Sequence, residues 1–525
     1  MATKPLVVRT AVTLLTCAAL AACGTTVSGV GAGSAGGAPD GVSTTGSASV
    51  GSGGTTPSGI TAIGSQPGAG MATAVGAGAT TTGATTTGPT VSGGVVGNSS
   101  SIPLTGPGWD AKNVYVGVPT ADDFNGAAKS AGANLNNGSF HGDVDAIIAD
   151  INKAGGVLGR TVVAAYHDTS TVALTSNPSS TAESMCTYFT QDRPVIAVIN
   201  GAPQLDAQEG FHRCLEQKKV SLLSFANTDY NDQDYSRLGP HLFTIASLST
   251  DLVVPSFVAA LNRQTFFTGW NTTVGAAGTA PVRVGILLPD TAAGHHVDQL
   301  LRANLKGIGV TVAADFFYDP SGAGSKSQAE VLKFTSAKVT HVLDLPPIAA
   351  EVYLFQGAAE QQRYRPRYGF TSFNLPLSTE ENSSIAPAAQ QIGSMGIGWQ
   401  PYNDTNASHD YGPLPGSKRC FAALAAGQQK FNGSSRRAAL IAVQFCDALY
   451  LLRDAIVAGH GFTGADILRS MPIAGPKLLS ALTFQSTLSS TNHGLPGYYV
   501  DQEYRKDCSC FVYVGGKHPF SRTGS

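Results

Sequence analysis

The chain has 525 residues and a formal net charge of −2, and only 13% of its residues are charged. This composition provides no basic surface, so we expect no nucleic-acid partner. The part with a globular composition, residues 109–525, is longer than one hydrophobic core usually supports, which predicts two lobes.

The N-terminus has the pattern of a lipoprotein signal. Lys4 and Arg9 form a short positive region, residues 11–19 are apolar, and residues 20–23 read LAAC, a lipobox that is cut before its cysteine. The segment is too short for a lasting transmembrane helix. We therefore expect residues 1–22 to be a signal peptide and Cys23 to be lipidated, which anchors the chain on the extracytoplasmic face of the cell membrane. An ordinary secretory signal with a chance cysteine is the alternative.

Residues 23–108 are rich in Gly, Ser, Thr and Ala, and Asp40 is the only charged residue between positions 24 and 107. Such a tract lacks the large apolar side chains that offset chain entropy, so we expect a disordered tether. Its root-mean-square reach as a flexible coil is about 50 Å. A fibrous or phase-separating role is the alternative. No stretch of the body that follows is long and apolar enough to cross a bilayer.

Strand and helix patterns alternate through the body, as a doubly wound sheet requires. Strands are expected at residues 114–118, 161–166, 195–200, 220–225, 282–288, 310–317, 341–345 and 367–370. Helices are expected at residues 206–217, 252–263, 296–308, 327–334 and 349–361. The order repeats twice, with a break near residues 242–250, which indicates two similar lobes.

The most informative stretch is residues 150–160, which read DINKAGGVLGR. Apolar residues recur at helical spacing from Val144 to Ile151, and the glycine pair at 155–156 offers the positive φ that ends a helix. Residues 161–166 read as a buried strand. The block is therefore a helix between parallel strands, the building unit of an α/β sheet.

With the strand at 114–118 and with His167 and Asp168 after the second strand, this block resembles the start of the leucine/isoleucine/valine-binding family. These proteins are the type I periplasmic-binding-fold receptors of ABC importers. The sequence pattern DINxAGGVxGR is fairly specific to this family. A generic Rossmann-like turn is the alternative interpretation. The resemblance covers nearly the whole body, although only this block is strong as a motif.

The resemblance implies an α/β fold of two Rossmann-like lobes joined by three hinge crossings. The first lobe would comprise residues 109–244 and 397–480, and the second residues 245–396 and 481–525. The crossings are expected near residues 242–250, 393–404 and 481–497. A last hairpin, with strands at 497–501 and 510–514, would finish the second lobe.

The function that the resemblance implies is that of a lipid-anchored receptor, which closes on a small polar or amphipathic ligand and delivers it to an ABC importer. Its partners would be that ligand, the permease subunits of the importer and the membrane. We expect a monomer with no cofactor. A ligand-sensing module for a signalling partner is one alternative, and an exported hydrolase is another.

Ligands of open α/β sheets bind beyond the carboxyl ends of the strands. The resemblance places a ligand carboxylate against two first-lobe loops, at Ala202, Pro203, Gln204, Ala226, Asn227 and Thr228. A helix starting near Leu205 would point its positive dipole at the same place. The other candidates are Asp122 and Phe124 in the first lobe and Thr291, His295, Thr371, Ser372 and Phe373 in the second. Thr228 as a mere turn cap is the alternative.

The sequence departs from the amino-acid receptors in the second lobe. Those receptors usually place a carboxylate after the fourth strand, where this chain has residues 371–373, and commonly a tyrosine after the first. An unpaired buried ammonium is costly. Unless Asp122, Asp229 or Asp290 substitutes, we expect a ligand other than a simple α-amino acid. Trp399 would either line the pocket or pack in the hinge.

Once Cys17 leaves with the signal and Cys23 is lipidated, an even number of cysteines remains, which favours disulfides over metal in an exported chain. Fifteen connectivities are possible. We favour Cys186 with Cys214, on helices that should be neighbours in this fold, and then Cys420 with Cys446. Cys508 and Cys510 are too close to pair with each other without strain, unless each sulfur has another partner, and their connectivity stays open.

The sequence contains no motif that supports an enzyme. The zincin pattern H-E-x-x-H, the G-x-S-x-G elbow and the phosphate-binding loop are all absent. His295 and His296 lie near Asp290 and Asp298, but adjacent histidines point in different directions on a strand or a helix. We therefore expect neither catalysis nor a metal site.

Overall fold

The computed structural model describes residues 102–121, 123, 125–126, 137–225, 229–320, 324–345, 349–429 and 436–524. The predicted signal peptide, Cys23 and residues 24–101 of the predicted tether lie outside the described residues. Within the described ranges, no helix combines the length and the apolar character that a membrane span requires.

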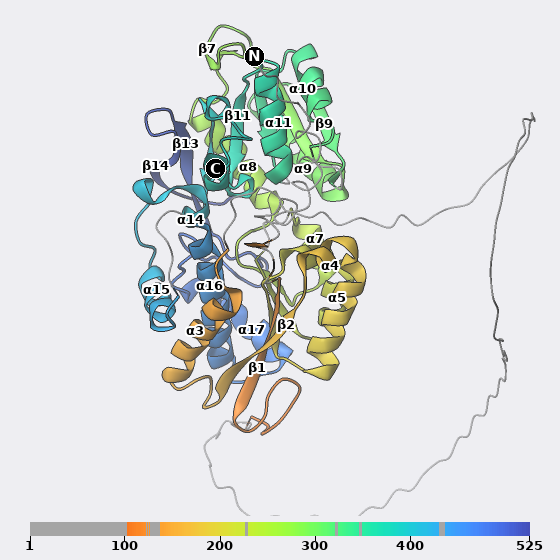
Figure 1. Cartoon of the computed structure of the whole chain (residues 1–525), viewed down its shortest axis with the longest axis vertical. Helices are drawn as coiled ribbons and strands as arrows, with labels where there is room; N and C mark the ends of the chain where they lie inside the picture. The colour runs from red at the N-terminus through yellow and green to blue at the C-terminus, as the bar shows by residue number, and fades with distance from the viewer. Residues whose placement is uncertain are drawn as a thin grey trace, which may run out of the picture. The chain divides into compact units, whose positions relative to one another are not determined.

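The first lobe is built on a five-stranded parallel sheet with the strand order β2-β1-β3-β4-β5. The strands are β1 (Asn113–Thr120), β2 (Thr161–Asp168), β3 (Ala197–Asn200), β4 (Ser221–Ser224) and β5 (Leu242–Thr244). The helices are α3 (Phe140–Lys153), α4 (Thr171–Ser176), α5 (Pro178–Thr187), α6 (Glu209–Gln217), α7 (Asp232–Leu238), α15 (Ser417–Ala426), α16 (Arg437–Gly459) and α17 (Gly464–Ala474). One buried cluster joins the sheet to α3, α16 and α17, and another joins it to α5 and α6. The sheet is therefore covered on both faces (Figure 1).

The block at residues 150–160 performs a structural task. Asn152 at the end of α3 binds the backbone of β2 through two hydrogen bonds, from its Nδ2 to the Val162 carbonyl at 2.9 Å and from the Val162 N–H to its Oδ1 at 2.8 Å. Gly156 has φ +69°, and a Cβ there would lie 2.0 Å from the Arg160 carbonyl oxygen. The motif therefore sets the turn from α3 into β2.

The second lobe contains a seven-stranded sheet with the order β14-β13-β12-β11-β10-β8-β9. The strands are β8 (Val284–Pro289), β9 (Val312–Tyr318), β10 (His341–Asp344), β11 (Arg367–Thr371), β12 (Met395–Gly398), β13 (Tyr498–Arg505) and β14 (Cys510–Pro519). The helices are α8 (Thr250–Arg263), α9 (Ala292–Gly307), α10 (Ser327–Ser336), α11 (Ala349–Gln361), α12 (Pro376–Glu381) and α13 (Ala388–Gln391). A small ribbon, β6 (Trp270–Asn271) with β7 (Ala276–Ala277), precedes β8.

Strands β8 to β12 are parallel and repeat the 2-1-3-4-5 order of the first lobe, as the repeated sequence pattern predicted. The predicted last hairpin forms β13 and β14, which extend the sheet antiparallel and are longer than expected. In this order the direction in which successive strands are added to the sheet reverses at the first strand, between β1 and β3 and between β8 and β10. These two switch points are where ligands bind in such sheets.

The chain crosses between the lobes three times, as predicted, and the crossings are bonded to one another. The first and third meet where the Leu495 N–H donates to the Thr244 carbonyl at 2.8 Å. The first and second meet at the Ala246 carbonyl, which accepts from Trp399 Nε1 at 2.9 Å and from Gln400 Nε2 at 2.7 Å. Because β12 stays in the second sheet, the second crossing lies at Trp399 and Gln400.

The first lobe begins earlier than residue 109. The Pro103 carbonyl accepts from Trp109 Nε1 at 3.2 Å and from Arg160 Nη2 at 3.1 Å, and the Leu104 carbonyl lies 3.4 Å from the same guanidinium nitrogen. The arginine of the 150–160 block therefore holds the start of the body in place. The predicted boundary at residue 108 shifts to about residue 102.

Deletion of residues 24–101 is expected to leave the melting temperature of the protein within about 2 °C of the parent, because this composition buries little apolar surface. Differential scanning calorimetry of the two proteins measures this directly. Deletion of residues 24–108 is the matched comparison and should lower the melting temperature, because it removes the carbonyls that Arg160 binds. A large drop for the shorter deletion would show that the tract packs.

The body contains three disulfides, of which two are those favoured from sequence. Cys186–Cys214 joins α5 to α6 with Cα atoms 6.3 Å apart, and Cys420–Cys446 joins α15 to α16 with Cα atoms 5.7 Å apart. The third joins Cys508 to Cys510, a pair whose connectivity the sequence left open and for which strain was expected. Ser509 between them has φ +52°, and this turn brings their Cα atoms to 5.2 Å, within the usual span of a disulfide.

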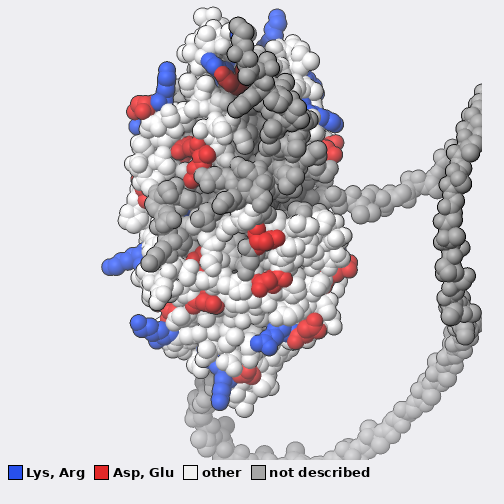
Figure 2. Space-filling view, in the orientation of Figure 1, with Lys and Arg blue, Asp and Glu red and all other residues white. Residues whose placement is uncertain are grey.

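On the face shown in Figure 2, the described acidic and basic side chains are scattered singly or in small groups among uncharged residues. This view agrees with the low charged content of the sequence.

Candidate functional site

At the first-lobe switch point, β3 leads into a short 3-10 helix, η3 (Pro203–Ala207). The helix expected from Leu205 instead starts at Glu209 as α6, so the predicted dipole contribution from Leu205 was wrong. The reason is the Asp206 carbonyl, which accepts from His212 Nε2 at 2.9 Å and from the Tyr230 hydroxyl at 2.6 Å. These two hydrogen bonds hold η3 in place, and α6 begins only at Glu209.

The same network makes the turn at Ala202 rigid. Asn200 donates from Nδ2 to Asp206 Oδ2 at 2.9 Å, and its Oδ1 accepts from the Ala202 N–H at 3.0 Å. Burial lowers the pKa of His212 to about 4, so its ring is neutral at pH 7. The turn after β3 is therefore held by buried, mostly neutral groups, which suits a preformed binding surface.

Gln204 and Asp229 are the strongest indications of a ligand on this surface. Gln204 is 4% exposed and Asp229 is 5% exposed. Both polar atoms of the Gln204 amide, and Oδ2 of Asp229, have no hydrogen-bond partner among the described residues. Burial raises the pKa of Asp229 to about 7. Because an unsatisfied buried polar group costs about 1–3 kcal/mol, both side chains are candidates for contact with a ligand.

Several predicted site residues fall in the gaps of the described ranges. Asp122, Phe124, Ala226, Asn227 and Thr228 lie outside the described residues, as does the side chain of Pro203. The residues that flank them are described. Ala202 is fully buried at the start of the η3 turn.

In the second lobe, Thr291 and His295 lie at the start of α9. Thr291 is its N-cap and accepts from the Gly294 N–H at 3.0 Å. His295 Nε2 lies 2.9 Å from Asp290, and His296 Nε2 lies 3.0 Å from Asp251 in the first turn of α8. The two neighbouring histidines thus bind different carboxylates, in agreement with the expectation that they point apart.

Thr371, Ser372 and Phe373 are buried and bonded internally. Ser372 Oγ donates to Asp404 Oδ2 at 2.6 Å and accepts from the Trp399 N–H at 2.8 Å. The Phe373 ring packs edge-on against Trp399, with centroids 5.0 Å apart. In this structure the three residues support the second crossing. No local sequence pattern indicated this role, because Asp404 lies 32 residues beyond Ser372.

A cavity of about 340 Å³ is lined by residues from both lobes: Leu377, Glu380, Glu381, Asn406, Ala407, Ser408, Arg436 and Ser509. Arg436 is 7% exposed, and its guanidinium donates to Asp410 at 3.1 Å and to the Asn406 carbonyl at 3.0 Å. Burial raises the pKa of Glu380 to about 7. The cavity therefore offers both signs of charge.

Sequence reasoning missed Glu380 as a candidate. It lies on α12, directly after β11 and η5 (Ser372–Asn374), close in sequence to the position where the amino-acid receptors carry a carboxylate. The pair of acidic residues at 380–381, following a predicted strand and turn, was the available signal.

Within the described ranges, one group of three metal-ligating side chains occurs, His409 with Cys508 and Cys510, whose ligand atoms lie within 4.8 Å of one another. The two sulfurs are bonded to each other. Disulfide sulfurs are not thiolates and do not ligate a metal as such.

No protein-family model matches the sequence, and no curated protein matches it. The fold, however, matches solved structures over about three quarters of the chain. A solute binding protein of an ABC transporter from Rhodopseudomonas palustris HaA2, in complex with p-hydroxybenzoic acid, superposes with a TM-score of 0.56 at 14% identity, covering 78% of this chain and 98% of that one. A leucine binding protein from Thermotoga maritima MSB8 gives 0.53 at 13% identity, covering 77% and 98%.

A periplasmic binding protein type 1 from Bordetella pertussis Tohama I gives a TM-score of 0.52 at 14% identity, covering 78% of this chain and 100% of that one. The chain has the type I periplasmic-binding fold. This confirms the fold that the block at residues 150–160 implied. Gln204 follows β3 at the first-lobe switch point, and Asp229 follows the neighbouring strand β4.

Proposed function

We propose that this protein is an extracytoplasmic solute receptor that binds a small polar or amphipathic ligand between its lobes and delivers it to an ABC importer. The observation that carries the proposal is the buried Gln204 amide at the first-lobe switch point, which has no hydrogen-bond partner among the described residues. Oδ2 of Asp229, after the neighbouring strand β4, is also buried without such a partner. Contacts that both lobes make only in the shut state would drive closure.

The lipobox supports an anchor at Cys23, with the Gly/Ser/Thr/Ala-rich tract as tether and the importer's permease subunits as partners. The receptor is proposed to act as a monomer, without catalysis and without a cofactor. The solved structures of the same fold have ligands that include leucine and p-hydroxybenzoic acid. We propose a ligand that carries a hydrogen-bonding group for Gln204 next to an apolar or aromatic part.

The first experiment is a thermal-shift screen of the protein against amino acids, amides, sugars, polyols and small aromatic acids. A ligand that binds only the folded state stabilises it, by about 2.7 kcal/mol at a ligand concentration of a hundred times Kd. This stabilisation raises the midpoint temperature of unfolding. A shift with one chemical class supports the receptor and names the ligand type. Silence across all classes would count against small-solute binding.

Gln204→Leu is expected to weaken the binding of that ligand by about 10- to 100-fold, because the ligand's polar group would lose its buried partner. Isothermal titration calorimetry measures the affinity. Gln328→Leu is the matched control, since Gln328 is exposed on α10 in the second lobe. An unchanged affinity for Gln204→Leu would move the site elsewhere.

Transport and sensing are separated in the cell. Deletion of the permease genes should abolish uptake of the ligand if the receptor feeds an importer. Intact uptake with a lost cellular response would instead favour a sensory module.

A further inference from the structure

The third disulfide lies in the turn between β13 and β14 and is built differently from the other two. Cys508 and Cys510 are separated by one residue, Ser509, whereas the other pairs are separated by 28 and 26 positions. Cys510 is fully buried, but Cys508 is partly exposed and Ser509 is exposed. An incoming nucleophile therefore reaches the Cys508 sulfur first.

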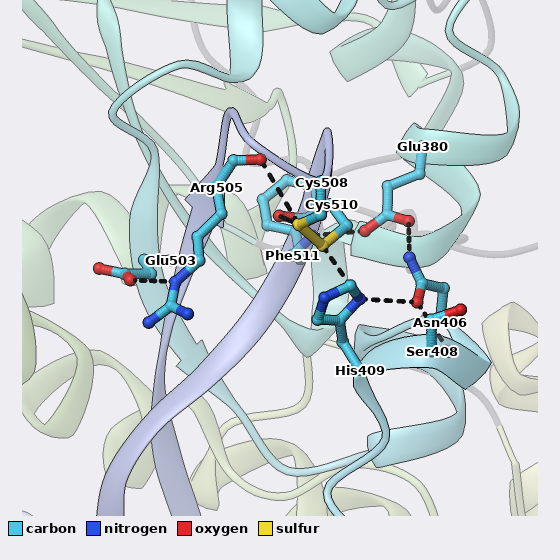
Figure 3. The surroundings of a disulfide bond; sticks show 9 residues. All are labelled: Glu380, Asn406, Ser408, His409, Glu503, Arg505, Cys508, Cys510 and Phe511. Atoms are coloured by element: carbon cyan, nitrogen blue, oxygen red, sulfur yellow. Dashed lines mark hydrogen bonds and ion pairs between the residues drawn. A yellow bond between two sulfur atoms is a disulfide. The ribbon is translucent and has the colours of Figure 1, made fainter.

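A histidine from another segment lies against the buried sulfur. His409, at the end of the short helix η6 (Ala407–His409), has its Nδ1 3.4 Å from Cys510 Sγ. Figure 3 shows this ring beside the disulfide, with Asn406 to its right and Glu380 above Asn406. Neither the proposed receptor function nor the packing of the hairpin calls for an imidazole at this sulfur.

The surroundings select the tautomer of that ring. Asn406 is oriented by two bonds, since its Nδ2 donates to Glu380 at 3.1 Å and its Oδ1 accepts from the Ser408 N–H at 3.1 Å. The same Oδ1 lies 3.2 Å from His409 Nδ1. An amide oxygen only accepts, so the proton of a neutral ring belongs on Nδ1. The single Nδ1 proton of His409 thus lies between two acceptors, Asn406 Oδ1 at 3.2 Å and Cys510 Sγ at 3.4 Å, and can be shared with the sulfur.

Space for a small thiol lies alongside. Ser509, between the two cysteines, lines the 340 Å³ cavity together with Asn406 and Ser408. A small molecule in this cavity therefore contacts the residue that separates the two cysteines.

We propose that Cys508–Cys510 is a thiol–disulfide exchange site for small thiols, with His409 as the hydrogen-bond donor to the leaving sulfur. A thiolate attacks Cys508 Sγ, the S–S bond breaks, and its electron pair goes to Cys510 Sγ, which the His409 N–H stabilises and which then takes up a proton. A second thiolate attacks the sulfur of the first thiol and releases Cys508 as a thiolate, which is protonated from water.

Atoms and electrons balance in this exchange. Two thiols are oxidised to one disulfide, the protein disulfide is reduced by two electrons to two thiols, and the two protons of the small thiols end on the cysteines. The reverse reaction lets the reduced protein oxidise with a small disulfide. The buried sulfur leaves and the exposed sulfur is attacked, which is the order that the burial of the two cysteines imposes.

The test uses the full chain under native conditions with L-cysteine as the thiol. Samples are quenched with an alkylating reagent at successive times, and the reduced fraction of each disulfide is measured by mass spectrometry. Cys508–Cys510 should be reduced at least about 100-fold faster than Cys420–Cys446, whose sulfurs are fully buried. Equal rates for the two disulfides would overturn the proposal.

Two variants test the histidine. His409→Leu removes the donor and should slow the reduction of Cys508–Cys510 about tenfold, since a hydrogen bond to a developing thiolate is charge-assisted. His409→Asn places an amide N–H near the former Nδ1 position and should keep most of the rate. If the leucine variant reacts as fast as the parent, His409 has no role and exposure alone explains the reactivity.

Cysteine variants test the direction of attack. In Cys510→Ser, cystine should form a mixed disulfide with Cys508. In Cys508→Ser, Cys510 should remain unmodified over the same time. The opposite labelling would overturn the assignment of the attacked sulfur. Near-ultraviolet circular dichroism confirms that each variant is folded, and the rate comparison on the unmodified protein needs no variant at all.

Discussion

Trp399→Ala is expected to lower the free energy of unfolding by about 3–5 kcal/mol, the usual range for removing a buried tryptophan. Trp399 is fully buried in the second crossing. Its ring packs against Phe373 and Phe520, with centroids 5.0 and 5.5 Å away, and its Nε1 binds the Ala246 carbonyl of the first crossing. Equilibrium unfolding in urea, followed by circular dichroism, measures the loss.

Trp399→Phe is the matched control, because it keeps an aromatic ring and removes the N–H. Its cost should be only about 1 kcal/mol, since the Ala246 carbonyl still accepts from Gln400 Nε2 at 2.7 Å. A similar loss for both variants would show that the hydrogen bond, and not the packing of the ring, holds the crossings together. A loss below about 1 kcal/mol for the alanine variant would contradict a central role for Trp399 in the crossings.

Glu330→Gln is expected to stabilise the protein by about 2–4 kcal/mol at pH 8 and to change little near pH 4.5. Glu330 and Glu351 are fully buried in the second lobe, on α10 and α11, and Asp344 at the end of β10 is 4% exposed. Burial, followed by the neighbouring Glu351 and Asp344, raises the pKa of Glu330. The folded protein therefore keeps a proton there that the unfolded chain loses above its ordinary pKa.

The sign of the pH dependence follows from this difference. Because the native state binds the extra proton above about pH 4.3, the free energy of unfolding falls as pH rises from there towards the raised pKa. A glutamine side chain cannot ionise, so the variant escapes that fall. Unfolding titrations at about pH 5, 6.5 and 8 should show a shallower slope for Glu330→Gln than for the parent. The exposed Glu183→Gln on α5 should leave the slope unchanged, and equal slopes for parent and Glu330→Gln would refute the prediction.

The positions of the strands along the chain could be predicted, because the sequence patterns that mark a strand are local. Apolar runs such as 161–166 and 341–345 read as buried strands, and the structure has β2 and β10 there. The block at 150–160 was specific for the same reason, since Asn152 and Gly156 act on residues only a few positions away. The resemblance and the repeated order together led to the two lobes and the three crossings.

The candidate site was predicted less completely. Gln204 was named from the resemblance and lies at the switch point, buried and without a partner among the described residues. Residues 371–373 were named for the same reason. In the structure Ser372 is hydrogen-bonded to Asp404 and Trp399, and Phe373 packs against Trp399 of the second crossing. Glu380 was overlooked, because its hydrogen-bond donors, the Phe511 N–H and Asn406 Nδ2, are both distant in sequence.

By itself, the sequence determined where most strands and helices lie, because periodicity depends on nearby residues. Its resemblance to a known family implied the class of the fold, and the pairs Cys186–Cys214 and Cys420–Cys446 were favoured choices. Only the tertiary structure decided which of the described polar side chains are left unpartnered, that Cys508 bonds to Cys510, and that His409 stands at that bond. The physical reason is that burial and hydrogen bonding depend on contacts between segments far apart in the chain, as from His409 to Cys510.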